Sequence, residues 1–440
     1  MNCPNCNTEN RPSAKFCDQC ASPVSDSTST ETNGPEKRGP LDGIKVLDWT
    51  MWQFGPVSTM MLGDLGADVI KVESLDGDHG RQFRRVAGAS SQLPGGLNAY
   101  FESLNRQKRS IALDLKNPKG VEILHRLVAQ SDVFVQNFRQ GVAERLGMGY
   151  EDLIKHNPKL IYGAATGYGP IGPDSDQPAF ALTGEARSGS LFWGGPDDGK
   201  PYNLGGIADQ MAGVMLSYGI LGALVARERK GVGQKVDVSH LGSLMWLGGN
   251  RYGIALISKN VPRRQDRTAV LNPLWNFYRC EDDRWIAFSM NQSDRYWPPF
   301  CKAIGHRELI DDPKFNGMER RAENRVELVR LLDGIFESKP RDAWEGMFAG
   351  NGDIIWTRVQ DVFDLPDDPQ VIANNYIVDY DHPVLGPSKW IQTPVGYSST
   401  PVSAVKAAPA HGANTEEILI ESLGCSWEDI SKLQEEGVIL

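Results

Sequence analysis

Residues 44–73 decide the fold: Ile-Lys-Val-Leu-Asp-Trp (44–49), Thr-Met-Trp-Gln-Phe-Gly-Pro (50–56), an apolar stretch with helical spacing (57–65), and Asp-Val-Ile-Lys-Val-Glu (68–73). This order predicts a strand, a turn, a helix and a second strand. Pro56 suits the first turn of the helix and Gly66 its C-terminal cap. Two parallel strands joined by a helix form a right-handed crossover, and the loops at the carboxyl ends of such strands border the ligand crevice. We therefore expect Gln53 and Glu73 to lie near a binding site.

The same alternation continues along the chain. Further strands are predicted at 109–114, 132–136, 160–164 and 235–239, with helices at 118–129, capped by Asn117, and at 207–229. Strands that alternate with helices indicate an α/β fold with an open, doubly wound, mostly parallel sheet. We divide the chain into a zinc ribbon (1–24), a linker (25–40), the first part of a large domain (41–260), a smaller inserted α+β domain (261–355) and a return to the large domain (356–440). The last predicted helix, 415–423, is followed by a short acidic tail.

Composition narrows the class of protein. The chain has 440 residues, and a net charge of −10 argues against a nucleic-acid or membrane-surface binder. No apolar run approaches the roughly 18 residues of a membrane span. The first residues lack the basic and then apolar pattern of a signal peptide, so we expect a cytoplasmic protein.

Four of the seven cysteines form two Cys-x-x-Cys pairs near the N-terminus: Cys3, Cys6, Cys17 and Cys20. Two such knuckles provide four thiolates for one tetrahedral Zn²⁺, and a redox pair or unrelated thiols are the alternative. Because four thiolates leave no open coordination position, we expect a structural zinc. The remaining cysteines, Cys280, Cys301 and Cys425, are expected to be buried thiols.

Two residues could carry chemistry. Asp209 follows Gly205-Gly206 and opens the long predicted helix, where free N–H groups and the helix dipole favour an ionised carboxylate. Such a carboxylate can act as a nucleophile, although a plain helix cap is the alternative. The Gln53 amide could hold a reacting oxygen, or it could be an ordinary turn residue. Scattered basic residues in the α/β region, including Lys108 and Arg109, would suit a polyanionic ligand, or they could be solvated surface charges.

Several stretches together resemble the class III CoA-transferases, the family of formyl-CoA and carnitine-CoA transferases and of 2-methylacyl-CoA racemases. They are Gly39-Pro-Leu-Asp-Gly-Ile-Lys-Val-Leu-Asp48, Leu65-Gly-Ala-Asp-Val-Ile-Lys-Val-Glu73, Asn105-Arg-Gln-Lys-Arg-Ser-Ile-Ala-Leu-Asp-Leu-Lys116, Asp132-Val-Phe-Val-Gln-Asn-Phe-Arg139, Ala208-Asp209-Gln-Met-Ala-Gly213 and Ala408-Pro-Ala-His-Gly412. The resemblance covers about residues 39–440, and the zinc ribbon lies outside it. It implies an interlocked dimer in which each chain has a large α/β domain and a small inserted domain.

The resemblance also implies a mechanism and a set of site residues. Asp209 matches the aspartate that attacks an acyl-CoA thioester, giving first a mixed anhydride and then an aspartyl-CoA thioester, and Gln53 matches the glutamine beside it. By the same resemblance, the residues expected to contact CoA are Val72, Glu73, Leu113, Lys116, Asn137, Phe138 and Arg145.

Three departures from the family pattern stand out. Ser74 replaces an arginine placed against adenine in some relatives, and Ala181 replaces an acidic residue that the racemase branch uses as a base, so racemisation is disfavoured. The glycine run that covers the site in oxalate-linked transferases is missing. We therefore expect a CoA-transferase that acts on an acyl-CoA such as succinyl-CoA and a free acid. It could be one subunit of a heteromer acting on an aromatic succinate, as in benzylsuccinate activation during aromatic degradation. The alternative is a non-catalytic, CoA-binding subunit paired with an active class III chain.

Overall fold

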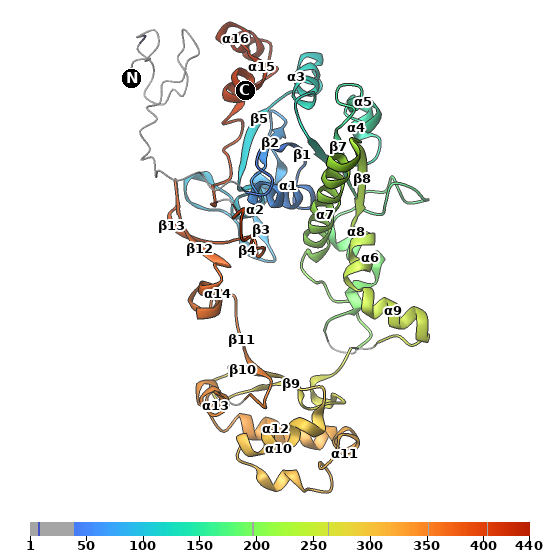
Figure 1. Ribbon diagram of the computed structural model, residues 1–440, viewed down its shortest axis with the longest axis vertical. Helices are drawn as coiled ribbons and strands as arrows, with labels where there is room; N and C mark the ends of the chain where they lie inside the picture. Colours follow the sequence, from blue (N-terminus) through green and yellow to red (C-terminus); the bar gives the residue numbers. More distant parts are fainter. Residues whose placement is uncertain (1–7, 9–38, 196–197, 263, 351, 403) are drawn as a thin grey trace. The chain divides into compact units, whose positions relative to one another are not determined.

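The computed structural model describes residues 8, 39–195, 198–262, 264–350, 352–402 and 404–440 (Figure 1). The predicted zinc ligands, Cys3, Cys6, Cys17 and Cys20, lie outside the described residues. The chain divides into two compact units. The first comprises Met1–Leu191, Asn203–Asn260 and Val378–Leu440, and the second comprises Phe192–Tyr202 and Val261–Ile377.

The first unit is built on a parallel sheet of six strands in the order β5-β2-β1-β6-β7-β8. Their bounds are β1 Lys45–Trp49, β2 Asp68–Glu73, β5 Lys108–Ala112, β6 Val133–Gln136, β7 Ile161–Thr166 and β8 Gln234–Ser239. Val46 of β1 lies opposite Val69 of β2 on one side and Val133 of β6 on the other. The strand order therefore reverses between β1 and β6, and this switch point is where open α/β sheets bind ligands.

Helices cover both faces of this sheet, as the doubly wound prediction requires. Helices α1 (Phe54–Asp64) and α7 (Ile207–Lys230) bury the face that carries Val46. Helices α3 (Pro118–Val128), α15 (Thr415–Leu423) and α16 (Trp427–Glu435) bury the face that carries Leu47. Because successive side chains of a strand point to opposite faces, neighbouring apolar residues of β1 supply two separate cores.

The first unit contains further helices and strands outside these two layers and the central sheet. They are β3 Arg85–Val86, β4 Ala89–Ser90, α2 Ala99–Asn105, α4 Val142–Arg145, α5 Tyr150–Leu153, α6 Ala181–Ser188, α8 His240–Leu247, α9 Gly249–Ser258 and β13 Gly386–Ile391, with β12, Ile377–His382, beginning at the boundary.

The sequence was expected to hold no apolar run near the length of a membrane span, but helix α7 is, among the described residues, the one helix long and apolar enough to cross a membrane by length and composition. Its residues Ala212, Leu216 and Ile220 are fully buried in the core that it shares with α1 and the sheet. A core helix passes the same test of length and composition, so we interpret α7 as the central helix of the first unit.

The second unit contains a three-stranded antiparallel sheet and several helices. The strands β9 (Trp275–Arg279), β10 (Trp285–Ser289) and β11 (Trp356–Val359) lie in the order β11-β10-β9. The helices are α10 Ser293–Ala303, α11 Met318–Glu323, α12 Arg325–Phe336, α13 Arg341–Phe348 and α14 Pro369–Ala373. We placed the end of the small domain at 355, but β11 (356–359) pairs with β10, and the second unit ends at Ile377. In addition to the segment that starts at Val261, the unit includes Phe192–Tyr202, which we had placed in the large domain.

The C-terminal residues differ from the expected acidic tail. Residues 427–435 form helix α16, and Ser426 and Asp429 make a reciprocal capping box at its start. Ile430, Val438 and Ile439 are buried in the core beside α15. The expectation of a tail was wrong because the segment contains, besides its acidic residues, a capping box and apolar residues that anchor it to the core.

Candidate active site

Two cavities lie at the carboxyl ends of the parallel strands. One, of about 370 Å³, is lined by the loop after β1, the loop after β6, Phe180, Asp209 and His240. The other, of about 240 Å³, is lined by Trp49, Val72, Leu113 and their neighbours. Met51 and Phe138 line both cavities, so the two adjoin at the switch point of the sheet.

Asp209 lies in the first turn of α7 and its side chain is 18% exposed. Gly206, at φ 81°, is the N-terminal cap residue, and its left-handed conformation suits glycine. The contact that fixes the carboxylate is long-range: Asp209 Oδ1 lies 2.7 Å from His240 Nε2. The structure thus places the predicted nucleophile in a cavity, in contact with a side chain from another helix.

His240 was not predicted from the sequence. It is the first residue of α8, directly after β8, and the Ser239 side chain accepts a hydrogen bond from Gly242 N at the start of the helix. The imidazole packs at 4.7 Å from the ring of Phe54. Its position at the carboxyl end of a predicted strand could have indicated a site residue. Its contact with Asp209 could not be predicted in this way, because the two residues are 31 positions apart in the sequence.

Gln53 lies at the N-terminal cap of α1 and is not among the residues that line the cavity. Its amide nitrogen lies 3.5 Å from Gln210 Oε1, the residue after Asp209. A Cβ atom on Gly206 would lie 3.8 Å from Gln53 Oε1. The glutamine therefore packs against the start of α7, beside the predicted nucleophile.

Tyr100 is an additional polar group near Asp209. Burial raises the pKa of the Tyr100 phenol, and the negative charges of Asp209 and Asp78 raise it further. The ring packs at 5.0 Å from Phe83, which in turn lies 5.8 Å from Trp52. The phenol therefore stays protonated at neutral pH.

The seven residues expected to contact CoA divide into three groups. Val72, Glu73, Leu113, Lys116 and Phe138 line the 240 Å³ cavity. Asn137 lines the cavity that contains Asp209, and its side chain hydrogen-bonds the Met51 backbone.

Arg145 lines neither cavity; it ends α4, and its guanidinium lies beside Gly141.

The Glu73 carboxylate is already engaged by the protein. It accepts hydrogen bonds from Arg81 Nε at 2.8 Å, Ser110 Oγ at 2.7 Å and Asp78 N at 3.0 Å. Burial alone would raise the pKa of Glu73, but these donors and the charges of Lys71 and Arg81 outweigh it and lower the pKa to about 2. Glu73 thus supports the wall of the cavity as a fixed, ionised group.

Two basic residues considered for anion binding are instead paired inside the fold. Lys108 is buried and its Nζ lies 2.8 Å from Asp48 Oδ2. Arg109 pairs with Asp68, Glu417 and Glu421. The interpretation as ligand-binding or solvated charges is wrong for both, because their acidic partners lie in other elements.

A buried ion pair supports the loop after β1. Lys71 Nζ lies 2.8 Å from Asp78 Oδ2 and donates to Thr50 O at 2.9 Å. Asp78 Oδ1 accepts from Trp52 N at 3.2 Å. Trp52 has φ 66°, a conformation that side-chain-bearing residues adopt rarely and only where surrounding contacts hold it.

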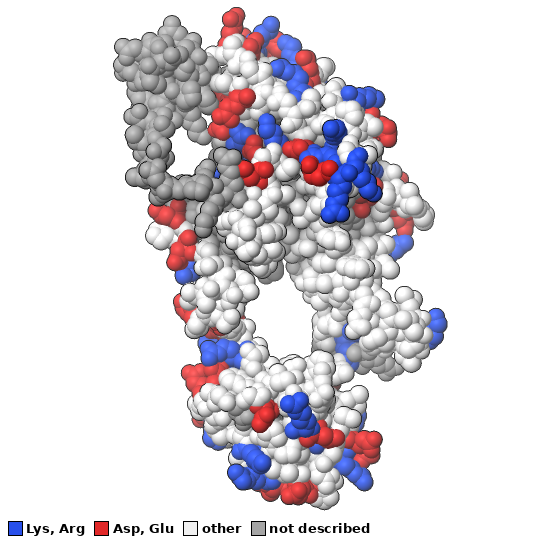
Figure 2. Space-filling model, viewed as in Figure 1, with Lys and Arg blue, Asp and Glu red and all other residues white. Residues whose placement is uncertain are grey.

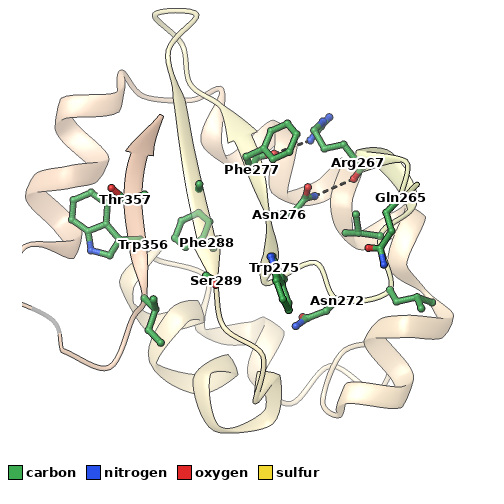
Figure 3. Close-up of a pocket in the computed structure, with 14 residues that line it drawn as sticks. Gln265, Arg267, Asn272, Trp275, Asn276, Phe277, Phe288, Ser289, Trp356 and Thr357 are labelled. Carbon is green, nitrogen blue, oxygen red and sulfur yellow. Dashed lines mark hydrogen bonds between the residues drawn. The ribbon is translucent and has the colours of Figure 1, made fainter. Parts of the chain in front are cut away.

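A larger cavity, of about 750 Å³, lies in the second unit (Figure 3). It borders the sheet β11-β10-β9, and Trp275, Phe277, Trp356 and Ile355 give it an apolar lining. Arg267 and Asn276 lie at one side, where Asn276 donates to Arg267 O and Arg267 to Phe277 O. No carboxylate, thiol or imidazole is among its lining residues, so size alone does not make it the reactive site.

Comparison with known proteins identifies relatives over nearly the whole chain. The model of CoA-transferase family III matches residues 41–415, and a zinc-ribbon domain model matches residues 2–24. The chain is 33% identical to the succinyl-CoA:glutarate CoA-transferase of Mus musculus, over 91% of this chain and 90% of that protein. It is 30% identical to the (R)-2-hydroxy-4-methylpentanoate CoA-transferase of Clostridioides difficile, over 91% of this chain and 99% of that protein. A solved CAIB/BAIF family protein from Brucella suis superposes with a TM-score of 0.78, at 29% identity over 88% of this chain and 100% of that one.

Proposed function

Since the chain belongs to CoA-transferase family III and is therefore a transferase of CoA groups, we propose that Asp209 is its nucleophile. The observation that carries this proposal is the Asp209 carboxylate in a cavity at the switch point of the sheet, held by His240. The cavity that adjoins it at Met51 and Phe138 extends toward Leu113 and Lys116, where the CoA moiety is proposed to bind.

The proposed reaction has four balanced steps. An Asp209 oxygen attacks the acyl-CoA carbonyl and expels CoA thiolate, leaving a mixed anhydride. The thiolate attacks Asp209 Cγ, so that a C–S bond forms and the donor acid leaves with the electron pair of the broken C–O bond. The acceptor carboxylate then attacks the aspartyl thioester at Cγ and expels the thiolate. Finally the thiolate attacks the acceptor acyl carbonyl and frees Asp209.

The cavity lining supports an acceptor acid with a bulky apolar group. Trp52 and Phe180 lie 6.0 Å apart in an edge-to-face arrangement, and both line the cavity that contains Asp209. Arg139 lines the same cavity and could pair with a second carboxylate. We therefore propose succinyl-CoA as a donor and an aromatic succinate as an acceptor.

A second chain is proposed to cover the exposed helices of the first unit. Trp246, Leu256 and Ile257 on α8 and α9 are 72%, 69% and 86% exposed. Figure 2 shows the corresponding region with few charged side chains. Large apolar side chains exposed on two successive helices are typical of a surface that binds another protein, and an interlocked homodimer or heterodimer would also keep water from the reactive acyl intermediates.

The N-terminal cysteines Cys3, Cys6, Cys17 and Cys20 are proposed to hold one structural Zn²⁺, because four thiolates complete a tetrahedral site. Zinc analysis of the purified protein should give about one ion per chain. Replacing Cys17 and Cys20 by Ser should remove the metal, and transferase activity should persist if the ribbon is only structural. A cytoplasmic location remains a prediction.

Replacement of Asp209 by Ala tests the proposed function. The D209A protein, incubated with succinyl-CoA and then hydroxylamine, should show no protein-bound hydroxamate and no CoA transfer. D283A is the matched control, because Asp283 is an 84% exposed aspartate on the second unit. If D209A transfers CoA at the wild-type rate, Asp209 is not the nucleophile. If the wild-type chain is active only with a second class III chain, the alternative of an obligate heteromer is supported.

A further inference from the structure

His240 is held rigidly beside Asp209. Its side chain is buried at 6% exposure, and its ring packs on Phe54. A Cβ atom at Gly184, on α6, would lie 2.5 Å from His240 Cβ. Helix α6 can therefore pack this closely against the histidine only because residue 184 is glycine. Three elements, α1, α6 and α8, therefore fix the direction of the imidazole.

The hydrogen bond to Asp209 is the polar contact that this ring makes. Nε2 lies 2.7 Å from Asp209 Oδ1, and an ionised carboxylate only accepts, so the proton is on Nε2. Nδ1 is buried without a hydrogen-bond partner within the described part of the chain. Leucine at position 240 would fill this space without leaving a buried polar atom unpaired. Packing alone therefore does not account for the imidazole.

We propose that His240 stabilises the oxyanion that forms on Asp209 itself. This inference rests on the proposed function. Once Asp209 is acylated, Oδ1 becomes the carbonyl oxygen of the aspartyl group and Oδ2 the bridging oxygen. When the CoA thiolate or the acceptor carboxylate attacks Cγ, the C=O electron pair moves to Oδ1, and the His240 N–H already points at that atom.

His240 can stabilise the developing charge in two of the four steps, those in which Asp209 itself is attacked. In the second and third steps the attacked carbon is Asp209 Cγ, and the charge develops at Oδ1, 2.7 Å from His240 Nε2. In the first and fourth steps the attacked carbon belongs to the substrate, and the charge develops on the substrate oxygen. No proton is transferred in any step, so His240 acts as a fixed hydrogen-bond donor and not as an acid or base.

His240→Leu and His240→Gln separate this role from packing. Leucine fills much of the volume without a donor, whereas the glutamine amide N–H can replace Nε2–H. His306→Leu is the matched control, because His306 also contacts a carboxylate, Glu308, at 2.8 Å but is exposed on the second unit. All variants are made in the full chain, and thermal unfolding checks that they fold.

The readout uses hydroxylamine with succinyl-CoA in the absence of an acceptor acid. Succinyl hydroxamate formed by enzyme in solution reports the anhydride of the first step, and hydroxamate on Asp209, found by peptide mass spectrometry, reports the thioester of the second. H240L should slow formation of the protein-bound product by roughly 100- to 1,000-fold, as loss of an oxyanion donor does elsewhere. The soluble product should change much less, and H240Q should recover most of the loss.

Failure of the His240 proposal can be distinguished from failure of the proposed function. An equal loss of both products in H240L would show that His240 orients the nucleophile for every step, and it would overturn the proposal. Wild-type amounts of the Asp209 hydroxamate in H240L would overturn it as well. Absence of the Asp209 hydroxamate in the active wild-type protein would instead refute the proposed function, whatever the His240 variants do.

Discussion

Asn137 binds the backbone of Met51 through both ends of its side-chain amide. Oδ1 accepts from Met51 N at 2.9 Å, and Nδ2 donates to Met51 O at 2.7 Å. Met51 follows β1 and Asn137 follows β6, the two strands between which the sheet order reverses. The amide therefore ties together the two loops that border both cavities.

Asn137→Ala should weaken binding of acyl-CoA more than it slows the chemical steps. Without the amide, the Met51 backbone loses two partners, each worth about 1 kcal/mol, and the loop gains freedom. We expect KM for acyl-CoA to rise roughly tenfold, and steady-state kinetics with varied donor measures it. The control is Asn374→Ala, since Asn374 donates to Gln370 O at 2.7 Å on the exposed surface. A normal KM in N137A would show that the loop is held by other contacts.

Two glycines of α7 should respond in opposite ways to alanine. A Cβ atom at Gly213 would lie 2.6 Å from Val57 Cγ1 and 2.9 Å from Phe54 O, whereas a Cβ atom at Gly222 would meet nothing within 4 Å. G213A should lower the free energy of unfolding by about 1–3 kcal/mol through overpacking of α1 on α7. G222A should raise it by roughly 0.5–1 kcal/mol through helix propensity. Urea unfolding of both variants measures the contrast, and equal effects would contradict this close approach of the two helices.

Glu73 should contribute a pH-dependent part of the stability. Its pKa is lowered from 4.5 to about 2 in the folded protein, so it stabilises the fold fully above pH 4.5 and loses that contribution as the pH falls toward 2. A shift of one pKa unit corresponds to about 1.4 kcal/mol, so the ionised Glu73 contributes roughly 3 kcal/mol to the free energy of unfolding.

The fall in unfolding free energy between pH 5 and pH 2.5 should be smaller in Glu73→Gln than in the wild type, as urea titrations at each pH would show. Glu337→Gln is the control, because Glu337 is 46% exposed and pairs only with Arg279 among the ion pairs of the described residues. Identical pH profiles of wild type and E73Q would exclude a lowered pKa for Glu73.

The sequence predicted the elements whose signals are local. The strand at 68–73 has the predicted bounds, and the helix after Asn117 begins as expected because the Asn117 side chain accepts from Lys119 N. The pairing of Lys108 with Asp48 could not be predicted, since the two residues are 60 positions apart and meet only when β5 joins the sheet. The contact of His240 with Asp209 likewise depends on how α7 and α8 pack. The capping box of α16, by contrast, is a local signal, since Ser426 and Asp429 are three positions apart in the sequence.

The two cavities share only Met51 and Phe138, and the rest of their linings come from different segments. Trp52, Phe180 and Gln177 face the cavity that contains Asp209, whereas Leu113 and Lys116 face the other. On the proposed assignment of the acid to one cavity and CoA to the other, substitutions in the cavity that contains Asp209 can change the preferred acid while the residues proposed to bind CoA stay the same. Such a division makes the chain a suitable scaffold for evolving new donor and acceptor pairs in the laboratory.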